Sequence, residues 1–148
     1  MKVLFFVLLV LNLTNCGGSS SLDGSSKQSP KIKEFGYCSQ GFINEMNIAE
    51  ISLKFYKDNG IEFGKILTEA HSEYSDIKEK YGEISCQARD RDTGNVFTIT
   101  NASVENYIKE SFAELSLARS QKCKSATTTD QKNGCSWIAN YMKEKFGN

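Results

Sequence analysis

The cysteines constrain the fold of this 148-residue chain more than any other feature. One cysteine lies near the N-terminus and four lie farther along: Cys16, Cys38, Cys86, Cys123 and Cys135. In an exported protein an even set of cysteines normally pairs into disulfides, and four cysteines allow three connectivities. A polar stretch, residues 124–134, separates Cys123 from Cys135, so a bridge across it is the simplest local choice. Cys38 is then left to pair with Cys86.

In the chain-entropy model the shorter bridge contributes ~3 kcal/mol to stability and the longer one ~4 kcal/mol. The alternative is a zinc site, which the sequence disfavours because no two cysteines have the Cys-x-x-Cys spacing. Two disulfides leave Cys16 without a partner, so the role of this cysteine depends on the segment in which it lies.

The first fifteen residues have the composition of a signal peptide. Lys2 supplies a positive charge, and residues 3–13 form an apolar run that only Asn12 interrupts. This run is too short for a transmembrane helix, which needs roughly 20 apolar residues. Its length is that of the hydrophobic region of a signal peptide.

The motif Leu13-Thr14-Asn15-Cys16 closes this segment. It resembles the lipobox of bacterial lipoproteins, in which the cysteine becomes the lipidated first residue of the mature chain. Leu13 and Thr14 fit the pattern, whereas Asn15 replaces the usual Gly, Ala or Ser, as in the relaxed lipoboxes of some bacterial groups. The resemblance implies acylation of Cys16, with palmitate among its chains, and a lipid anchor in the cell envelope. Gly17 in place of aspartate after the cysteine implies the outer membrane or the cell surface.

The residues that follow are typical of a flexible tether. Residues 17–30 are rich in Gly and Ser, and Leu22 is their only apolar residue. We therefore expect a signal peptide over residues 1–15, a lipidated cysteine and tether over 16–34, and a single globular domain over 35–148. The alternative is a soluble secreted protein whose signal peptide is cut near the same place.

Apolar residues recur at helical spacing in two stretches of the domain, each followed by a glycine. The first stretch contains Phe42, Met46, Ala49, Leu53 and Tyr56, and the second contains Phe63, Ile66, Leu67, Ala70, Tyr74, Ile77 and Tyr81. This pattern predicts two helices that end at Gly60 and Gly82. Ile48, Ile51 and Phe55 widen the first stripe, so we expect the first helix to be well buried.

The apolar period then changes from about 3.6 to 2. Residues 84–88 and 96–100 flank a turn at 92–95, which predicts a β-hairpin. A third helix follows, capped by Asn101 or Ser103, and a fourth runs from about Cys135 to Phe146. The predicted fold class is α+β and mostly helical, with about four helices and one hairpin in the order ααββαα, stapled by two disulfides.

No catalytic constellation is visible in the sequence. His71 is the single histidine, so a site with two histidine ligands is excluded, and the chain has no Gly-x-Ser-x-Gly motif. We expect His71 to be structural. Residues 89–95 are interpreted as a solvated hairpin tip, because they lack the ligand pattern of an EF-hand calcium loop. We therefore expect no catalytic residue, no metal ligand and no cofactor.

The balance of charge also limits the partners. The 18 basic and 18 acidic residues argue against a nucleic-acid partner. The aromatic residues Trp137, Tyr141 and Phe146 either belong to the core or line a groove for a partner's helix. The sequence thus favours a lipid-anchored envelope lipoprotein with a non-catalytic binding or structural domain, whose partner is the membrane and another envelope or host protein. The alternatives are a secreted binding or effector protein and, after that, a small hydrolase.

Overall fold

The computed structural model describes residues 36–147, so the predicted signal peptide, Cys16 and the tether lie outside the described residues. The elements follow in the order α1 (Gln40–Asn59), the 3₁₀ turn η1 (Ile61–Phe63), α2 (Gly64–Tyr81), β1 (Ser85–Arg89), β2 (Val96–Thr100), α3 (Asn101–Ser120), the 3₁₀ turn η2 (Lys122–Ser125) and α4 (Thr129–Phe146). The predicted fold class is confirmed: the fold is α+β, mostly helical, in the order ααββαα.

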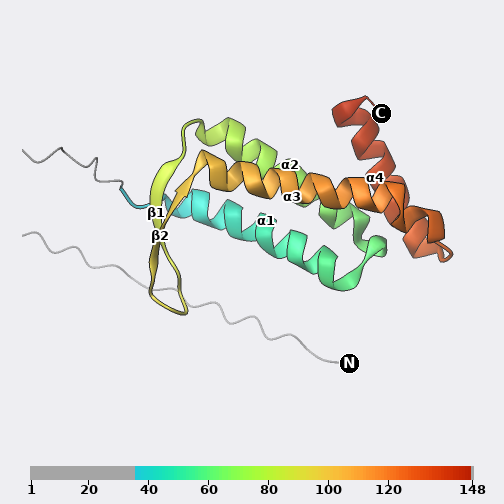
Figure 1. The fold of residues 1–148 in the computed structure, drawn as a ribbon, viewed down its shortest axis with the longest axis horizontal. Helices are drawn as coiled ribbons and strands as arrows, with labels where there is room; N and C mark the ends of the chain where they lie inside the picture. Colours follow the sequence, from blue (N-terminus) through green and yellow to red (C-terminus); the bar gives the residue numbers. More distant parts are fainter. Residues whose placement is uncertain (1–35, 148) are drawn as a thin grey trace, which may run out of the picture. The chain divides into compact units, whose positions relative to one another are not determined.

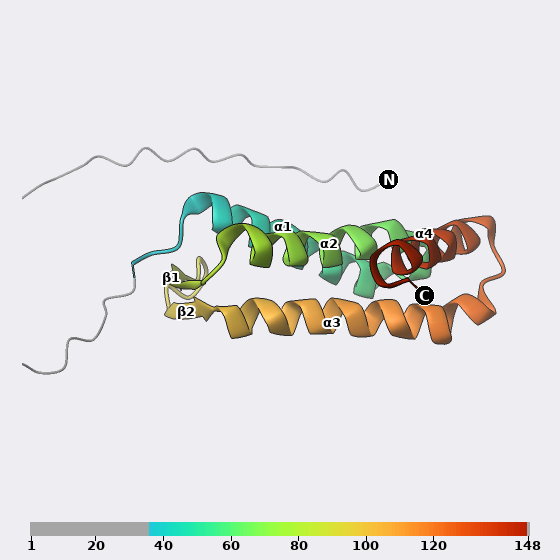
Figure 2. The same cartoon turned by 90° about the horizontal axis from the view of Figure 1, so that it is seen from above.

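Three long helices, α1, α2 and α3, lie along a common direction, and α2 packs against both of the others (Figures 1 and 2). The antiparallel hairpin of β1 and β2 lies at one end of these helices and projects beyond them at its tip. At the opposite end α4 crosses the bundle and packs on η1, α2 and α3. None of the helices within residues 36–147 is long and apolar enough to cross a membrane.

The core runs along α2 and receives one face from each neighbour. Its largest fully buried side chains are Tyr56, Leu67, Tyr74, Ile77, Leu115 and Ile138. Tyr74 stacks on Tyr107 of α3 with ring centroids 5.0 Å apart. Full burial of a large apolar side chain contributes roughly 1.5–3 kcal/mol, so these residues supply much of the stability.

The structure confirms both predicted disulfides. Cys38–Cys86 joins the residues before α1 to β1, and Cys123–Cys135 joins η2 to α4. Backbone hydrogen bonds support the first bridge: Cys38 N donates to Gln87 O (2.8 Å) and Gln87 N donates to Gly36 O (3.0 Å). The start of the domain therefore lies alongside β1 as a short parallel bridge.

The predicted start of the fourth helix at Cys135 is wrong, because α4 begins six residues earlier, at Thr129. Thr128 caps it: the Thr128 side chain accepts from Gln131 N (3.2 Å), and Gln131 Oε1 accepts from Thr128 N (3.3 Å). This reciprocal capping box satisfies backbone groups that would otherwise begin the helix unpaired. The polar stretch between Cys123 and Cys135 is thus mostly helical.

A close crossing of backbones explains why Gly134 lies inside α4. A Cβ atom on Gly134 would collide with the carbonyl group of Ile61 in η1, and one on Gly64 would collide with the carbonyl of Gly134. Only glycine at both positions lets α4 approach the start of α2 this closely.

The expectation that α1 is well buried is also wrong. Ile48 and Ile51 are 60% and 67% exposed, and Phe55 is 40% exposed, although its ring meets Phe63 edge-on at 4.9 Å. The reason is the position of α1 at the side of the bundle, where one face is covered by α2 and the outer face has no neighbour among the described residues.

The third helix begins as predicted, but its cap is Thr100. Ser103 Oγ accepts from Thr100 N (3.2 Å), and Ser103 N is capped in return by the Thr100 side chain. Asn101 has a different role, because its Oδ1 accepts a hydrogen bond from Ile84 N (2.6 Å) and fixes the base of the hairpin.

Candidate functional site

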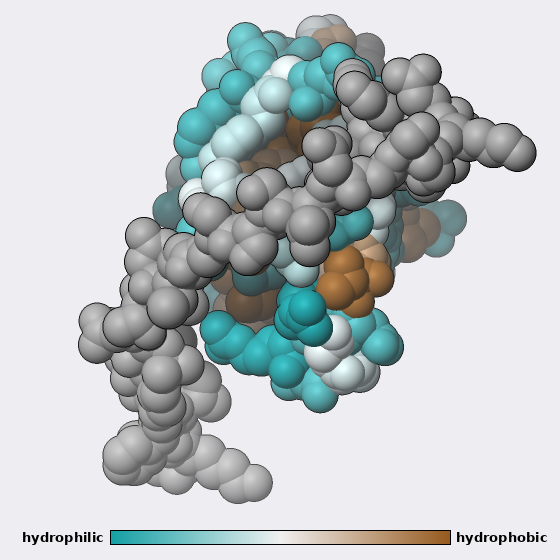
Figure 3. Space-filling model, turned by 90° about the vertical axis from the view of Figure 1, so that its left-hand side faces the viewer, coloured by the Kyte–Doolittle hydropathy of each residue, from teal (hydrophilic) through white to brown (hydrophobic). Residues whose placement is uncertain are grey.

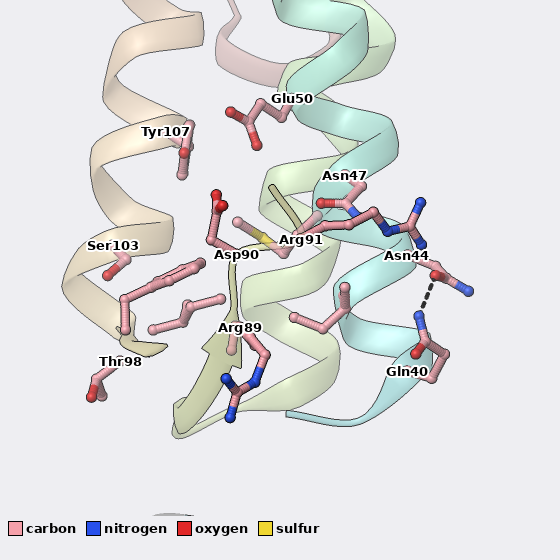
Figure 4. A pocket seen from close by; sticks show the side chains of 15 residues that line it. Gln40, Asn44, Asn47, Glu50, Arg89, Asp90, Arg91, Thr98, Ser103 and Tyr107 are labelled. Atoms are coloured by element: carbon pink, nitrogen blue, oxygen red, sulfur yellow. Dashed lines mark hydrogen bonds between the residues drawn. The ribbon is translucent and has the colours of Figure 1, made fainter. Parts of the chain in front are cut away.

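A groove of about 710 Å³ lies in the corner between the hairpin, α1 and α3 (Figure 4). We call it the hairpin groove. Its floor is apolar and consists of Ile43, Met46, Ala88, Phe97 and Ile99, whereas most of its rim is polar. Figure 3 views the molecule from the end that carries the hairpin and shows hydrophobic side chains in a recess between hydrophilic ones.

The pairing of the two strands builds the floor. Cys86 lies opposite Ile99 and Ala88 lies opposite Phe97, so these side chains share the face of the hairpin that is turned toward the helices. Ala88 and Ile99 are buried, whereas the larger side chain of Phe97, opposite Ala88, stays 49% exposed. A large aromatic ring is thus open to solvent at the floor of the groove.

The α1 side of the rim carries a row of carboxamides. Gln40, Asn44 and Asn47 follow one another at spacings of four and three residues, which places them on one side of the helix. Gln40 Nε2 donates to Asn44 Oδ1 (2.8 Å), and both residues are exposed. Each carboxamide both donates and accepts hydrogen bonds, so the row suits a polar ligand of either kind.

The hairpin side of the rim contains Arg89, Asp90 and Arg91. Asp90 Oδ1 accepts from Thr93 N (2.6 Å) and Thr93 Oγ1 (2.7 Å), and these hydrogen bonds lower the pKa of the carboxyl group. Arg89 Nη1 donates to Gly94 O (2.9 Å). The side chains of Asp90 and Arg89 therefore stabilise the turn at the tip of the hairpin. Arg91 makes none of the ion pairs found among residues 36–147 and extends toward the carboxamide row (Figure 4).

The α3 side of the rim carries Ser103 and Tyr107. Burial raises the pKa of the Tyr107 phenol, and the nearby carboxylates of Glu50 and Glu110 raise it further. Glu50 and Tyr107 also line a smaller hollow of about 200 Å³ farther along α1 and α3. The ion pair Lys57–Glu110 bridges the two helices beside that hollow.

The single histidine lies outside the hairpin groove. His71 is 4% exposed, its Nδ1 is 2.7 Å from Tyr141 Oη, and the rings of Phe112 and Phe146 lie beside it. Burial lowers the pKa of its imidazole, and the charge of Lys145 lowers it further. The expected structural role fits this environment.

For the α4 aromatic residues the core interpretation holds in part, whereas the groove interpretation does not hold for the two hollows described above. Tyr141 and Phe146 pack around His71, although Phe146 remains 40% exposed. Trp137 is 51% exposed on the surface, with the Lys65 ammonium 5.3 Å above its ring. None of the three lines either of the two hollows described above.

The tip at residues 89–95 is a solvated turn held by Asp90, in keeping with its interpretation from the sequence. Within residues 36–147 no three His, Cys, Asp or Glu side chains are grouped so that they could hold a metal ion.

The sequence did not reveal the groove, because its walls come from α1, the hairpin and α3. The spacing of Gln40, Asn44 and Asn47 was the one available signal, since it places three carboxamides on one side of the helix. Chemically, the groove offers an apolar floor with one aromatic ring, neutral hydrogen-bonding groups and one extended guanidinium. Comparison with known family models, curated proteins and solved structures found no match to this chain.

Proposed function

We propose that this chain is a lipid-anchored lipoprotein of the cell envelope whose domain binds another molecule in the hairpin groove and performs no chemistry of its own. The observation that carries the proposal is the groove itself, in which an exposed Phe97 lies below a rim of hydrogen-bonding side chains. Small-molecule and peptide sites commonly combine an apolar floor with a few polar groups that orient the ligand.

The two disulfides support the exported part of the proposal. Disulfides persist in oxidising compartments and are rare in the cytosol. The signal-peptide composition of residues 1–15 and the lipobox-like motif ending at Cys16 are consistent with the same compartment. Together they favour a domain that stands at the outer membrane or cell surface on the tether of residues 16–34.

The environment of His71 supports a non-catalytic domain. An acid–base group must reach a bound substrate, and the His71 imidazole is instead enclosed by aromatic rings and hydrogen-bonded to Tyr141. The groove contains Asp90, but the carboxylate of this residue already accepts hydrogen bonds from the turn. We propose that the groove binds another envelope protein or a host molecule and does not convert a substrate.

Metabolic labelling with palmitate tests the anchor. We expect the parent chain to take up label and the Cys16→Ser variant to take up none, and the intact mass of the mature protein should show acyl chains on Cys16 and two disulfides. An unlabelled parent with the mass of a chain cleaved near residue 16 would instead establish the alternative, a soluble secreted protein.

Site-specific photo-crosslinking in living cells tests the groove. A photoreactive residue at Asn47, on the groove rim, should give one discrete adduct, whereas the same residue at the exposed Lys132 of α4 should give none. The substitution Asn44→Trp, which places a bulky ring at the rim, should abolish the adduct. An adduct that forms equally at both positions, or that survives Asn44→Trp, contradicts the assignment of the groove.

A further inference from the structure

The end of α4 covers the single histidine of the chain. The His71 ring of α2 is 4% exposed, and its Nδ1 lies 2.7 Å from Tyr141 Oη. Phe146, the last residue of α4, meets the same ring edge-on with the centroids 5.8 Å apart. Phe112 of α3 lies beside the ring at 6.1 Å and packs against Phe146. His71 is thus enclosed by a residue from the middle of α3 and by the end of α4.

The two halves of α4 are held in different ways. The first half is fixed by the Cys123–Cys135 disulfide and by the close backbone crossing at Gly134. Among the described residues, no ion pair and no backbone hydrogen bond joins residues 136–147 to another element. The second half is therefore attached by its side chains, and its end points away from the three long helices (Figure 1). Helix ends open more readily than helix interiors, so this half is the more easily detached.

The enclosure suits a neutral imidazole better than a charged one. None of the ion pairs found within the described part of the chain involves His71. Burial lowers the pKa of its imidazole, and the Lys145 ammonium of α4 lowers it further. Burial raises the pKa of the Tyr141 phenol, and the carboxylates of Asp76 in α2 and Glu144 in α4 raise it further. From α3 the enclosure receives an uncharged ring. A buried imidazolium would have a neutral phenol as its neighbour and a positive charge nearby, which is costly.

We propose that protonation of His71 releases residues 141–146 of α4 from α2 and α3, while the first half of α4 stays in place. The charged ring must reach water. Of the elements that enclose it, only the end of α4 can move without breaking a disulfide or unwinding the middle of a helix. Release exposes the rings of Phe112 and Phe146, so the domain gains an apolar surface in acid at the end opposite the hairpin. This device depends on neither the proposed lipid anchor nor the groove ligand.

The size of the effect follows from the linkage between proton binding and release. In the released form the His71 ring is solvated and has the ordinary pKa of 6.5, whereas in the closed form the pKa is lower. The equilibrium constant for release therefore rises as the pH falls below 6.5. Between pH 7.5 and 5.5 the rise is up to about tenfold, and it ends once the closed form is also protonated.

Hydrogen exchange at single amides tests the proposal on the full chain carrying Cys16→Ser, which removes the lipid from the measurement. The amides of residues 141–146 should exchange before those of α1, because they open locally. After correction for the intrinsic exchange rate, their protection should fall by up to about tenfold between pH 7.5 and 5.5. In His71→Gln, whose side chain gains no charge, the protection should change by less than about twofold.

The imidazole signal of His71 gives a second readout, because the chain has a single histidine. Titration followed by NMR should show a pKa below 6.5 in the folded protein. Lys145→Gln, at an exposed position, removes a positive charge near the ring, so it should raise that pKa and reduce the loss of protection.

Three results overturn the proposal. The first is protection of residues 141–146 that does not change with pH in the parent. The second is a change of equal size in His71→Gln. The third is exchange of these amides only together with those of α1, because His71 would then take up its proton through unfolding of the whole domain.

Discussion

Replacing Gly134 by alanine should destabilise the domain, although alanine is the better helix former. The intrinsic preference for alanine over glycine inside a helix favours the variant by about 1 kcal/mol. In this structure, however, the new Cβ would lie 2.9 Å from the carbonyl carbon of Ile61 and closer still to its oxygen. Ordinary carbon contacts are about 3.5–4.0 Å, so α4 must move away from η1 by roughly an ångström.

That movement disturbs the packing of Ile138, which is fully buried one turn farther along α4. Overpacking typically costs about 1–3 kcal/mol of folding stability when the neighbouring side chains can move aside. Here the new Cβ meets the backbone carbonyl of Ile61, which cannot move as easily, so we expect a cost at or above the upper limit. After the gain in helix propensity we expect a net loss of about 2 kcal/mol or more. For a domain of this size that loss lowers the Tm by roughly 10 °C.

Urea unfolding and thermal melting of the oxidised protein measure the effect. Gly41→Ala in α1 is the matched control, because the added Cβ meets only Tyr81 Oη at an ordinary 3.5 Å. We expect this control to be neutral or up to about 1 kcal/mol more stable. If Gly134→Ala proves as stable as Gly41→Ala, the close crossing of α4 over η1 is refuted.

Three further predictions concern the Cys38–Cys86 disulfide and buried side chains of the core. Replacing Cys38 and Cys86 together by serine should cost about 4 kcal/mol in urea unfolding, and a loss below about 1 kcal/mol would contradict the constraint. Tyr74→Phe removes a buried hydroxyl without a partner and should be neutral or stabilising, whereas Tyr141→Phe breaks the hydrogen bond to His71 and should cost about 1 kcal/mol; the reverse order would be inconsistent with the structure. The folded pKa of His71 lies below its ordinary value of 6.5, so the unfolded chain takes up the proton first, and the stability present above pH 6.5 is lost as the pH falls through that value toward the folded pKa. Urea unfolding at pH 7.5 and 5.5 should show this loss in the parent and a smaller one in His71→Gln, and equal losses would refute the assignment.

Local pattern was sufficient to predict most of the fold. The helical spacing of Met46, Ala49 and Leu53 and the switch to period 2 at Ile84 each report which face of an element is buried, and the structure buries those faces. The pairing of Cys123 with Cys135 followed from a short separation along the chain.

The predictions failed where the structure of a segment depends on residues outside its apolar pattern. The start of α4 depends on the capping box of Thr128 and Gln131. These residues lie in a polar stretch without apolar periodicity, so the pattern used to find helices did not reveal them. The exposure of Ile48 and Ile51 depends on how many neighbours α1 has, which no pattern within α1 reports. The hairpin groove could not be predicted for the same reason, since its walls meet only after the chain has folded.

The fastening of the first described residues to β1 has a mechanical consequence. Tension applied to the chain before Gly36 reaches Cys38 and passes through a covalent bond into Cys86, while the hydrogen bonds of Gln87 to Gly36 and Cys38 share the load. Helix α1 begins only at Gln40, beyond this fastening, so a pull from the N-terminal side cannot unwind it from its first turn. The Cys38–Cys86 disulfide therefore shields α1 from tension that enters the domain from its N-terminal side.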